Sequence, residues 1–248
     1  MSPSGNGTAM PTIPQVLEQS ARDHPDRVAV SIVGGSALTY RELHLRVERF
    51  ATWLKRRGIT AGDRVAVLSD NGLTMFDTVL GSARIGAAVV PLGTGLARLQ
   101  IETLLADAEP ALVIVERAYA DEVAAAGIDV LVSDSPEYAK ALAAEPETLP
   151  YPSPQSIALI IYTSGTTGTA KGVCLTQDAL VYNARVSARS QGMSMQDVYL
   201  SATPMYHASA GLRIYTTLLD AQTHIVMPSF DADQWLDVVE TYGVTTTI

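Results

Sequence analysis

Hydrophobic and polar residues along this chain follow two periods in turn, one typical of strands and one typical of helices. Short apolar runs predict strands at residues 64–68, 87–91 and 111–115. Between them, apolar residues at helical spacing predict helices at residues 73–85 and 96–108. Because strands that alternate with helices form parallel sheets covered on both faces, the pattern predicts an α/β fold with parallel-rich sheets.

The N-terminal part adds a hairpin and a long amphipathic helix to this pattern. A glycine pair at residues 34–35 separates two short apolar runs, which predicts a hairpin. Thr39 and Glu42 have the spacing of a helix capping box. Apolar residues then follow at helical period, namely Leu43, Val47, Phe50, Ala51 and Leu54. We therefore expect a helix that starts after Thr39 and faces a core.

A cluster of prolines divides the chain into two predicted units. Because proline continues neither a helix nor a central strand, residues 145–155 are predicted to be a linker. We expect a flexible tail at residues 1–14 and two consecutive α/β subdomains at residues 15–144 and 156–248. The chain stops inside a predicted strand, so we interpret the second subdomain as incomplete and the sequence as an N-terminal fragment.

The second unit is predicted to begin with a buried strand at residues 157–162 and a short strand at residues 173–176. Thr176 is expected to cap a helix that runs to about Arg189. Further strands are predicted at residues 198–202, 223–227 and 244–248. The sequence therefore continues the α/β pattern to its end.

Composition and charge favour a globular protein that binds a small molecule. Hydrophobic residues make up 47% of the 248 residues, which is enough for a substantial core. A formal net charge of −9 argues against nucleic acid and against anionic membrane surfaces as partners. The apolar runs are too short to cross a bilayer. The N-terminus lacks a secretory leader pattern, so we expect a cytoplasmic protein.

The strongest chemical signal is a loop rich in glycine and hydroxyl groups, at residues 163–172 between two apolar segments. Glycines allow several backbone N–H groups to converge on an anion, and serine and threonine add donors. Lys171, one of three lysines in the chain, adds a positive charge. A Walker A loop is excluded because Ala170 and Gly172 replace its glycine and its Ser/Thr, and no Gly-x-Gly-x-x-Gly dinucleotide motif is present. The loop is therefore a phosphate loop of another kind.

With YTSGTTG at residues 162–168 and KGV at residues 171–173, the chain resembles the adenylate-forming, AMP-binding superfamily. Its members include acyl-CoA synthetases, adenylation domains of peptide synthetases and luciferases. Segments at residues 15–30, 38–54, 62–92 and 203–211 resemble the same enzymes in the same order. One departure is Ala170, where many members have proline, and it leaves the phosphate-contacting positions unchanged.

This resemblance implies a ligase that activates a carboxylic acid with ATP and Mg²⁺ and then forms a thioester, usually with coenzyme A. It implies a triphosphate cradle formed by Thr163, Ser164, Gly165, Thr166, Thr167 and Gly168. Lys171 is expected to act on the β- and γ-phosphates. His207 is expected either at the wall of the acyl or nucleotide pocket, or as a helix-start histidine with satisfied hydrogen bonds.

The other histidines are expected to be surface or structural residues, and the cysteine to be structural. His24, His44 and His224 share no metal-ligand spacing, so no metal site built by protein side chains is predicted. Cys174 is expected to be a small core residue.

The resemblance also implies that ribose-binding, Mg²⁺-binding and further catalytic residues lie beyond Ile248. We therefore expect no adenylation turnover from the isolated chain. An unpaired final strand is also expected to favour association with another copy or with a remaining portion of the chain. The alternative is a naturally short, non-catalytic nucleotide-binding or interaction protein.

Overall fold

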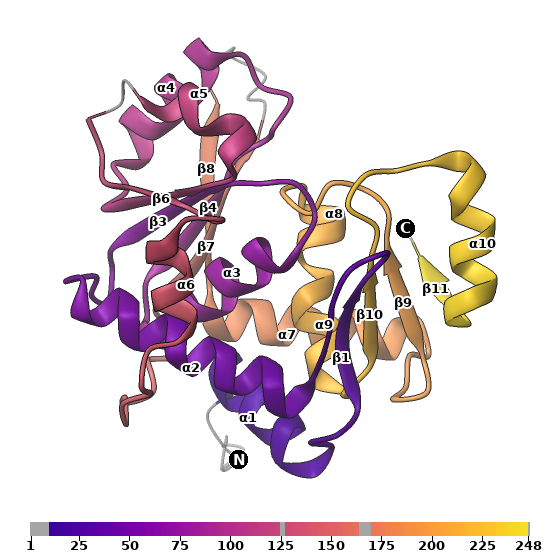
Figure 1. Ribbon diagram of the computed structural model, residues 1–248. Coiled ribbons are helices and arrows are strands. Elements are labelled where there is room, and N and C mark those ends of the chain that lie inside the picture. Colours follow the sequence, from indigo (N-terminus) through magenta and orange to yellow (C-terminus); the bar gives the residue numbers. More distant parts are fainter. Residues whose placement is uncertain (1–9, 125–126, 164–169, 248) are drawn as a thin grey trace, which may run out of the picture.

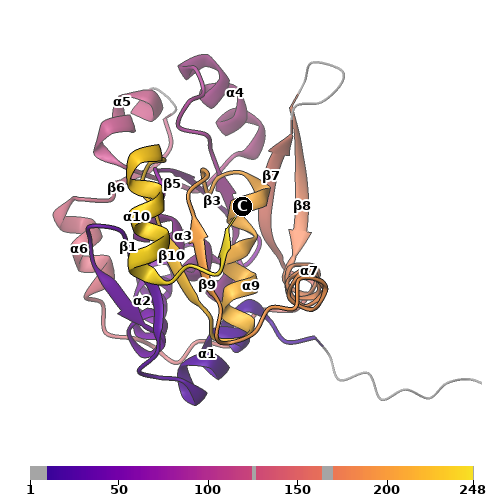
Figure 2. The same ribbon diagram turned by 90° about the vertical axis from the view of Figure 1, so that its right-hand side faces the viewer.

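The computed structural model describes residues 10–124, 127–163 and 170–247, which form two mainly parallel sheets with helices between and around them (Figures 1 and 2). The strand order of the first sheet is β11 (Thr246–Thr247), β9 (Val198–Ser201), β10 (Thr223–Val226), β1 (Val28–Ile32) and β2 (Ala37–Thr39). That of the second sheet is β6 (Val130–Val132), β5 (Leu112–Val115), β3 (Arg64–Leu68), β4 (Ala88–Pro91), β7 (Ile157–Thr163) and β8 (Lys171–Thr176). Within these sheets only the β1–β2 and β7–β8 pairs are antiparallel among the described residues. The predicted α/β class with parallel-rich sheets is confirmed.

Each sheet contains strands from before and after the proline-rich segment. Residues 145–155 contain no helix or strand, as a linker requires. However, β1 pairs with β10 in the first sheet, and β4 pairs with β7 in the second. Strands from both predicted subdomains thus share both sheets.

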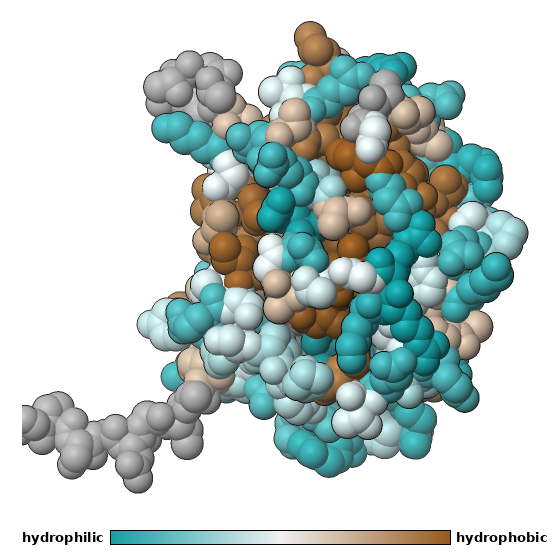
Figure 3. All heavy atoms as spheres, turned by 90° about the vertical axis from the view of Figure 1, so that its left-hand side faces the viewer, coloured by the Kyte–Doolittle hydropathy of each residue, from teal (hydrophilic) through white to brown (hydrophobic). Residues whose placement is uncertain are grey.

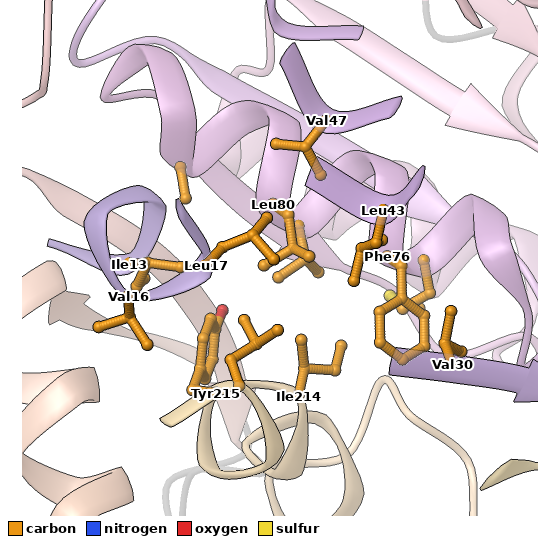
Figure 4. Close-up of a cluster of buried hydrophobic side chains, with 14 of the residues drawn as sticks. Ile13, Val16, Leu17, Val30, Leu43, Val47, Phe76, Leu80, Ile214 and Tyr215 are labelled. Carbon is orange, nitrogen blue, oxygen red and sulfur yellow. The ribbon is translucent and has the colours of Figure 1, made fainter. Parts of the chain in front are cut away.

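The largest core cluster lies between the two sheets. It contains side chains of α1 (Ile13–Asp23), α2 (Tyr40–Arg56), α3 (Leu73–Ile85), α7 (Gln177–Ser190) and α9 (Arg213–Leu219). Figure 4 shows part of this cluster, in which side chains of α1, α2, α3, α9 and β1 point toward one another: Ile13, Val16, Leu17, Val30, Leu43, Val47, Phe76, Leu80, Ile214 and Tyr215. Burying these apolar side chains holds the sheets at a fixed separation.

Shorter helices cover the remaining sheet faces. On the second sheet, α4 (Arg98–Ala108) and α5 (Ala120–Val123) pack on one face, and α6 (Pro136–Leu142) contributes to a cluster with α2. On the first sheet, α10 (Ala232–Tyr242) packs through Val238. Two further short helices are η1 (Arg117–Tyr119) and α8 (Ala208–Gly211). On the side of α4 to α6, apolar surface remains visible among polar side chains (Figure 3), as is usual for folded proteins.

Most predicted elements are confirmed, and two predictions about burial are wrong. β3 and α3 have the predicted bounds, and α2 begins after Thr39 with the predicted capping box. By contrast, β7 is buried only at Ala158 and Leu159, and Cys174 in β8 is exposed. The cause is that β8 is the edge strand of its sheet, and the described residues leave most of its surface uncovered. None of the described helices is long and apolar enough to cross a membrane.

Candidate functional site

The predicted phosphate loop joins β7 to β8, which lie side by side as a hairpin (Figure 2). The two ends of the loop face each other, because Thr163 of β7 pairs with Lys171 of β8. Both residues are exposed. The structure therefore places the two ends of the loop, whereas the rest of the predicted cradle lies outside the described residues: Ser164, Gly165, Thr166, Thr167 and Gly168.

Gly172 allows a tyrosine ring to lie across this hairpin. Tyr162 is the cross-strand partner of Gly172. A Cβ atom at position 172 would lie 3.0 Å from Cγ2 of Ile160 and 3.4 Å from the Tyr162 ring. The hydroxyl of Tyr162 donates a hydrogen bond to Asp107 near the end of α4. Burial, together with this hydrogen bond and the Asp107 charge, raises the pKa of Tyr162, so the phenol stays protonated and links α4 to β7.

A cavity of about 670 Å³ opens beside the hairpin. Thr163 and Ala170 line it from the two ends of the loop, and Tyr206 and His207 line it from the segment after β9. The rest of the wall is formed by the end of β4, the chain leading into α4, α4 itself and β7: Pro91, Gly93, Leu96, Leu99, Gln100, Thr103, Leu104, Ile161 and Tyr162. The structure therefore brings two predicted site residues, Thr163 and His207, to one cavity.

The cavity has the size and character of a small-molecule site. Its volume falls within the range of roughly 300–1,000 Å³ that is usual for such sites. Most wall side chains are apolar, and the polar ones include Gln100, Thr103 and Thr163. Three parallel strands, β3, β4 and β7, end at the same edge of the second sheet, and β4 and β7 lead directly into the cavity wall. This is the edge at which ligands bind in open α/β sheets.

Lys171 differs from the other two lysines in its surroundings. Lys55 lies 3.8 Å from a carboxylate oxygen of Glu147, and Lys140 lies 3.4 Å from one of Glu137. Lys171 forms no ion pair within the part of the chain that the structure describes. It follows Ala170, a wall residue, but does not itself line the cavity. Its exposed ammonium group is therefore available to an anion at the mouth of the loop.

His207 combines features of both hypotheses drawn from the sequence. It is the N-cap residue of α8, and it also lines the cavity. Its backbone N–H donates to the carbonyl of Pro204 at 3.1 Å, and its carbonyl accepts from the N–H of Gly211 at 2.8 Å. The imidazole makes no capping hydrogen bond and lies against Tyr206, with 4.5 Å between the ring centroids. Backbone contacts thus fix this residue, while its exposed ring faces the site.

Two glycines allow other backbone segments to approach the Tyr206–His207 wall. A Cβ atom at Gly211 would lie 2.5 Å from the carbonyl oxygen of Met205, which is closer than real contacts allow. A Cβ atom at Gly93 would lie 3.1 Å from the Tyr206 ring. The close packing at this wall therefore depends on glycine at both positions.

The wall formed by α4 is the part of the site that sequence reasoning does not find. The helical period at residues 96–108 predicts a helix there, but it does not indicate that Leu99, Gln100 and Thr103 face a cavity. Only the placement of α4 beside β7 determines this. No group of three or more His, Cys, Asp or Glu residues within the described ranges is arranged to hold a metal ion.

Comparison with protein-family models identifies the AMP-binding enzyme family over residues 17–248. Among curated relatives, feruloyl-CoA synthase of an Amycolatopsis species is 35% identical over 226 residues, covering 91% of this chain and 46% of that enzyme. Indoleacetate–CoA ligase of Aromatoleum aromaticum is 34% identical, covering 85% of this chain and 44% of that enzyme. 2-Succinylbenzoate–CoA ligase of Bacillus cereus is 30% identical, covering 95% and 48% respectively. The chain thus spans about half the length of the curated relatives it matches.

Solved structures give the same result for the fold. The N-terminal domain of FACL13 from Mycobacterium tuberculosis superposes with a TM-score of 0.88 at 26% identity, covering 96% of this chain and 62% of that chain. ATP-bound MatB from Rhodopseudomonas palustris superposes with a TM-score of 0.84 at 28% identity, covering 94% of this chain and 48% of that chain. Nearly all of the present chain is therefore included in the common fold.

Proposed function

This chain belongs to the AMP-binding enzyme family, and on that premise we propose that it is the triphosphate-binding part of an acyl-CoA ligase. In the proposed reaction, a carboxylate oxygen bonds to the α-phosphorus of ATP while the bond from that phosphorus to the pyrophosphate oxygen breaks. The thiol sulfur of coenzyme A then bonds to the acyl carbon, AMP leaves, and the thiol proton is released. The names of the three curated relatives described above, which are CoA ligases or synthases, support this proposal.

The single observation that carries the proposal is the shared cavity. Residues from both ends of the predicted phosphate loop and the exposed His207 line the same space. Displacement at phosphorus depends mainly on positioning and on neutralising charge, and one cavity that contacts both segments can position two reactants. Apolar side chains dominate the wall, so we expect the activated acid to carry an apolar body.

Thr163 and Lys171 are the described residues that suit a triphosphate. The hydroxyl of Thr163 and the ammonium group of Lys171 can both donate hydrogen bonds to phosphate oxygens. The two residues are cross-strand partners at the base of the loop. When bound, ATP supplies the electrophilic phosphorus and the pyrophosphate leaving group. In this proposal, Lys171 donates to the β- and γ-phosphate oxygens, so that the charge of the departing pyrophosphate is neutralised.

The proposed reaction also uses Mg²⁺ and coenzyme A. The described residues contain no cluster suited to hold a metal ion, so we assign no protein ligand to Mg²⁺. Coenzyme A would deliver its thiol to the acyl group held in the cavity. His207 lies at the wall where the acyl and nucleotide groups would meet, and we propose that its imidazole contacts them there.

The proposal is tested by measuring ATP binding to the chain and to two lysine variants by titration calorimetry. A charge-assisted hydrogen bond contributes about 1.5–3 kcal/mol, so Lys171→Ala should weaken ATP binding about tenfold or more. Lys140→Ala is the matched control, because Lys140 pairs with Glu137 on the distant helix α6. Equal ATP affinity in the wild type and Lys171→Ala would rule out the proposed role of Lys171.

We further propose that this chain alone does not complete adenylation, since it spans 46% of the length of feruloyl-CoA synthase. Exchange of labelled pyrophosphate into ATP, measured with aromatic and aliphatic acids, is expected to stay at the level of a protein-free blank. Exchange that depends on the added carboxylate would contradict this expectation. ATP binding without exchange fits both an enzyme part and the non-catalytic alternative, whereas carboxylate-dependent exchange fits only an enzyme.

A further inference from the structure

Asn71 lies between β3 and α3, at the edge of the second sheet where its parallel strands end. Its side chain is buried, with 8% of the residue exposed. It does not line the cavity of about 670 Å³ beside the β7–β8 hairpin. A buried amide at this edge requires hydrogen-bond partners, and those partners indicate what it does.

The side chain of Asn71 makes three hydrogen bonds to backbone groups of distant segments. Its Nδ2 donates to the carbonyl of Thr203 at 3.0 Å and to the carbonyl of Met227 at 3.1 Å. Its Oδ1 accepts from the N–H of Met205 at 2.7 Å. Only one orientation of the amide satisfies all three partners, because turning it over would place Oδ1 against a carbonyl oxygen.

These partners belong to the chain segments that leave two strands of the first sheet. Thr203 and Met205 follow β9 and enclose Pro204, which has no N–H of its own. Met227 follows β10, and its N–H donates to the carbonyl of Ser201 at 2.9 Å. One side chain at the edge of the second sheet therefore fixes the backbone that leaves both of these strands.

The segment that Asn71 holds leads directly to the cavity wall. Tyr206 and His207 follow Met205, and the carbonyl of Met205 is the atom that excludes a side chain at Gly211. Met205 itself is 1% exposed, so water cannot replace Asn71 as the hydrogen-bond acceptor for the Met205 N–H. Without the amide of Asn71, two carbonyls and one N–H beside this wall lose that partner.

We infer that Asn71 is a positioning residue that sets where Tyr206 and His207 stand in the cavity. It acts through the backbone of residues 203–205 and through Met227, and it touches no reacting group. The consequence for catalysis rests on the proposed function, whereas the geometric role does not. Its test therefore uses readouts that need no nucleotide.

The test measures amide hydrogen exchange at Met205 and the imidazole NMR signal of His207 in Asn71→Ala. The Met205 amide loses its acceptor, so its exchange is expected to accelerate about tenfold or more. The His207 signal is expected to shift, while those of His24 and His44 stay in place. Unchanged Met205 exchange and an unchanged His207 signal in the folded variant would overturn the inference.

Ser20→Ala is the matched control for simple loss of stability. It removes a buried hydrogen bond from Ser20 Oγ to the carbonyl of Leu218, 2.6 Å long, between α1 and α9. In this control, Met205 exchange is expected to rise no more than exchange in the β9 core, and the His207 signal should not shift. An equal response in both variants would show that Asn71 acts only on overall stability.

Asn71→Asp gives a second test if Asn71→Ala does not fold. The aspartate keeps an acceptor for the Met205 N–H but loses both donors, so two carbonyls face a carboxylate. The Met205 amide is expected to stay protected, whereas the His207 signal is expected to shift because Thr203 and Met227 are released. A His207 signal that coincides with the wild type would overturn the inference.

Discussion

Two of the four histidines in this chain have opposite environments. His207 is exposed at the cavity wall, whereas His224 is buried in the core. Nε2 of His224 lies 2.8 Å from Oγ of Ser201, and Nδ1 lies 3.2 Å from Oγ1 of Thr217. Burial, and to a lesser extent the charge of Arg213, lowers the pKa of His224 to about 3. The imidazole is therefore uncharged at neutral pH, and its contacts tie β10 to β9 and α9 inside the core.

The lowered pKa of His224 predicts a specific loss of stability in mild acid. The unfolded chain binds a proton at this residue below about pH 6.5, while the folded chain does so only near pH 3. The contribution to stability is thus fully present above pH 6.5 and is lost progressively as the pH falls toward 3. Between pH 7 and pH 5 the free energy of unfolding should fall by about 2 kcal/mol from this residue alone.

Urea unfolding of the wild type and of His224→Gln at both pH values measures this effect. Glutamine does not titrate, so the stability difference between the two proteins should shrink by about 2 kcal/mol on going from pH 7 to pH 5. A difference that stays constant over this range would mean that His224 titrates normally in the folded chain.

At the scale of elements, sequence predicts best where local chemistry fixes a boundary. The N–H of Glu42 donates to Oγ1 of Thr39 at 3.3 Å, and the N–H of Thr39 donates to Oε2 of Glu42 at 2.8 Å. Both contacts lie within four residues, so the capping-box spacing alone predicts the start of α2. Thr176 caps the start of α7 in a similar way, because its Oγ1 accepts a hydrogen bond from the N–H of Ala179 at 3.4 Å.

Burial and pairing of elements are predicted less well, because they depend on segments far away in sequence. A run of apolar residues predicts a strand, but the pattern of apolar residues does not show that β8 lies at a sheet edge with Cys174 exposed. Nor does it show that β7 pairs with β4 across the proline-rich segment. The same holds for the site, since the loop motif indicates Thr163 and Lys171, whereas the α4 wall and Asn71 follow only from the fold.

At the scale of the whole molecule, the candidate site lies where the two sheets meet. The second sheet contributes the ends of β4 and β7, and the first sheet contributes the segment after β9 that carries Tyr206 and His207. Because both sheets contain strands from both parts of the chain, folding of either sheet requires residues on both sides of the proline-rich segment. The two ends of the predicted phosphate loop, Thr163 and Ala170, and the His207 wall are therefore brought together by the same pairing that forms the core.

The most direct test is whether ATP bound at the loop is detected at His207. The four histidine imidazoles are observed by NMR while Mg-ATP is added. The His207 signal of the wild type should shift, and the midpoint of this shift should fall at the ATP concentration that calorimetry gives for half-saturation. The signals of buried His224 and of His24 and His44 should stay in place, and in Lys171→Ala the shift of His207 should require about tenfold more ATP. A His207 signal that does not move at saturating ATP would contradict a single site shared by the loop and this wall.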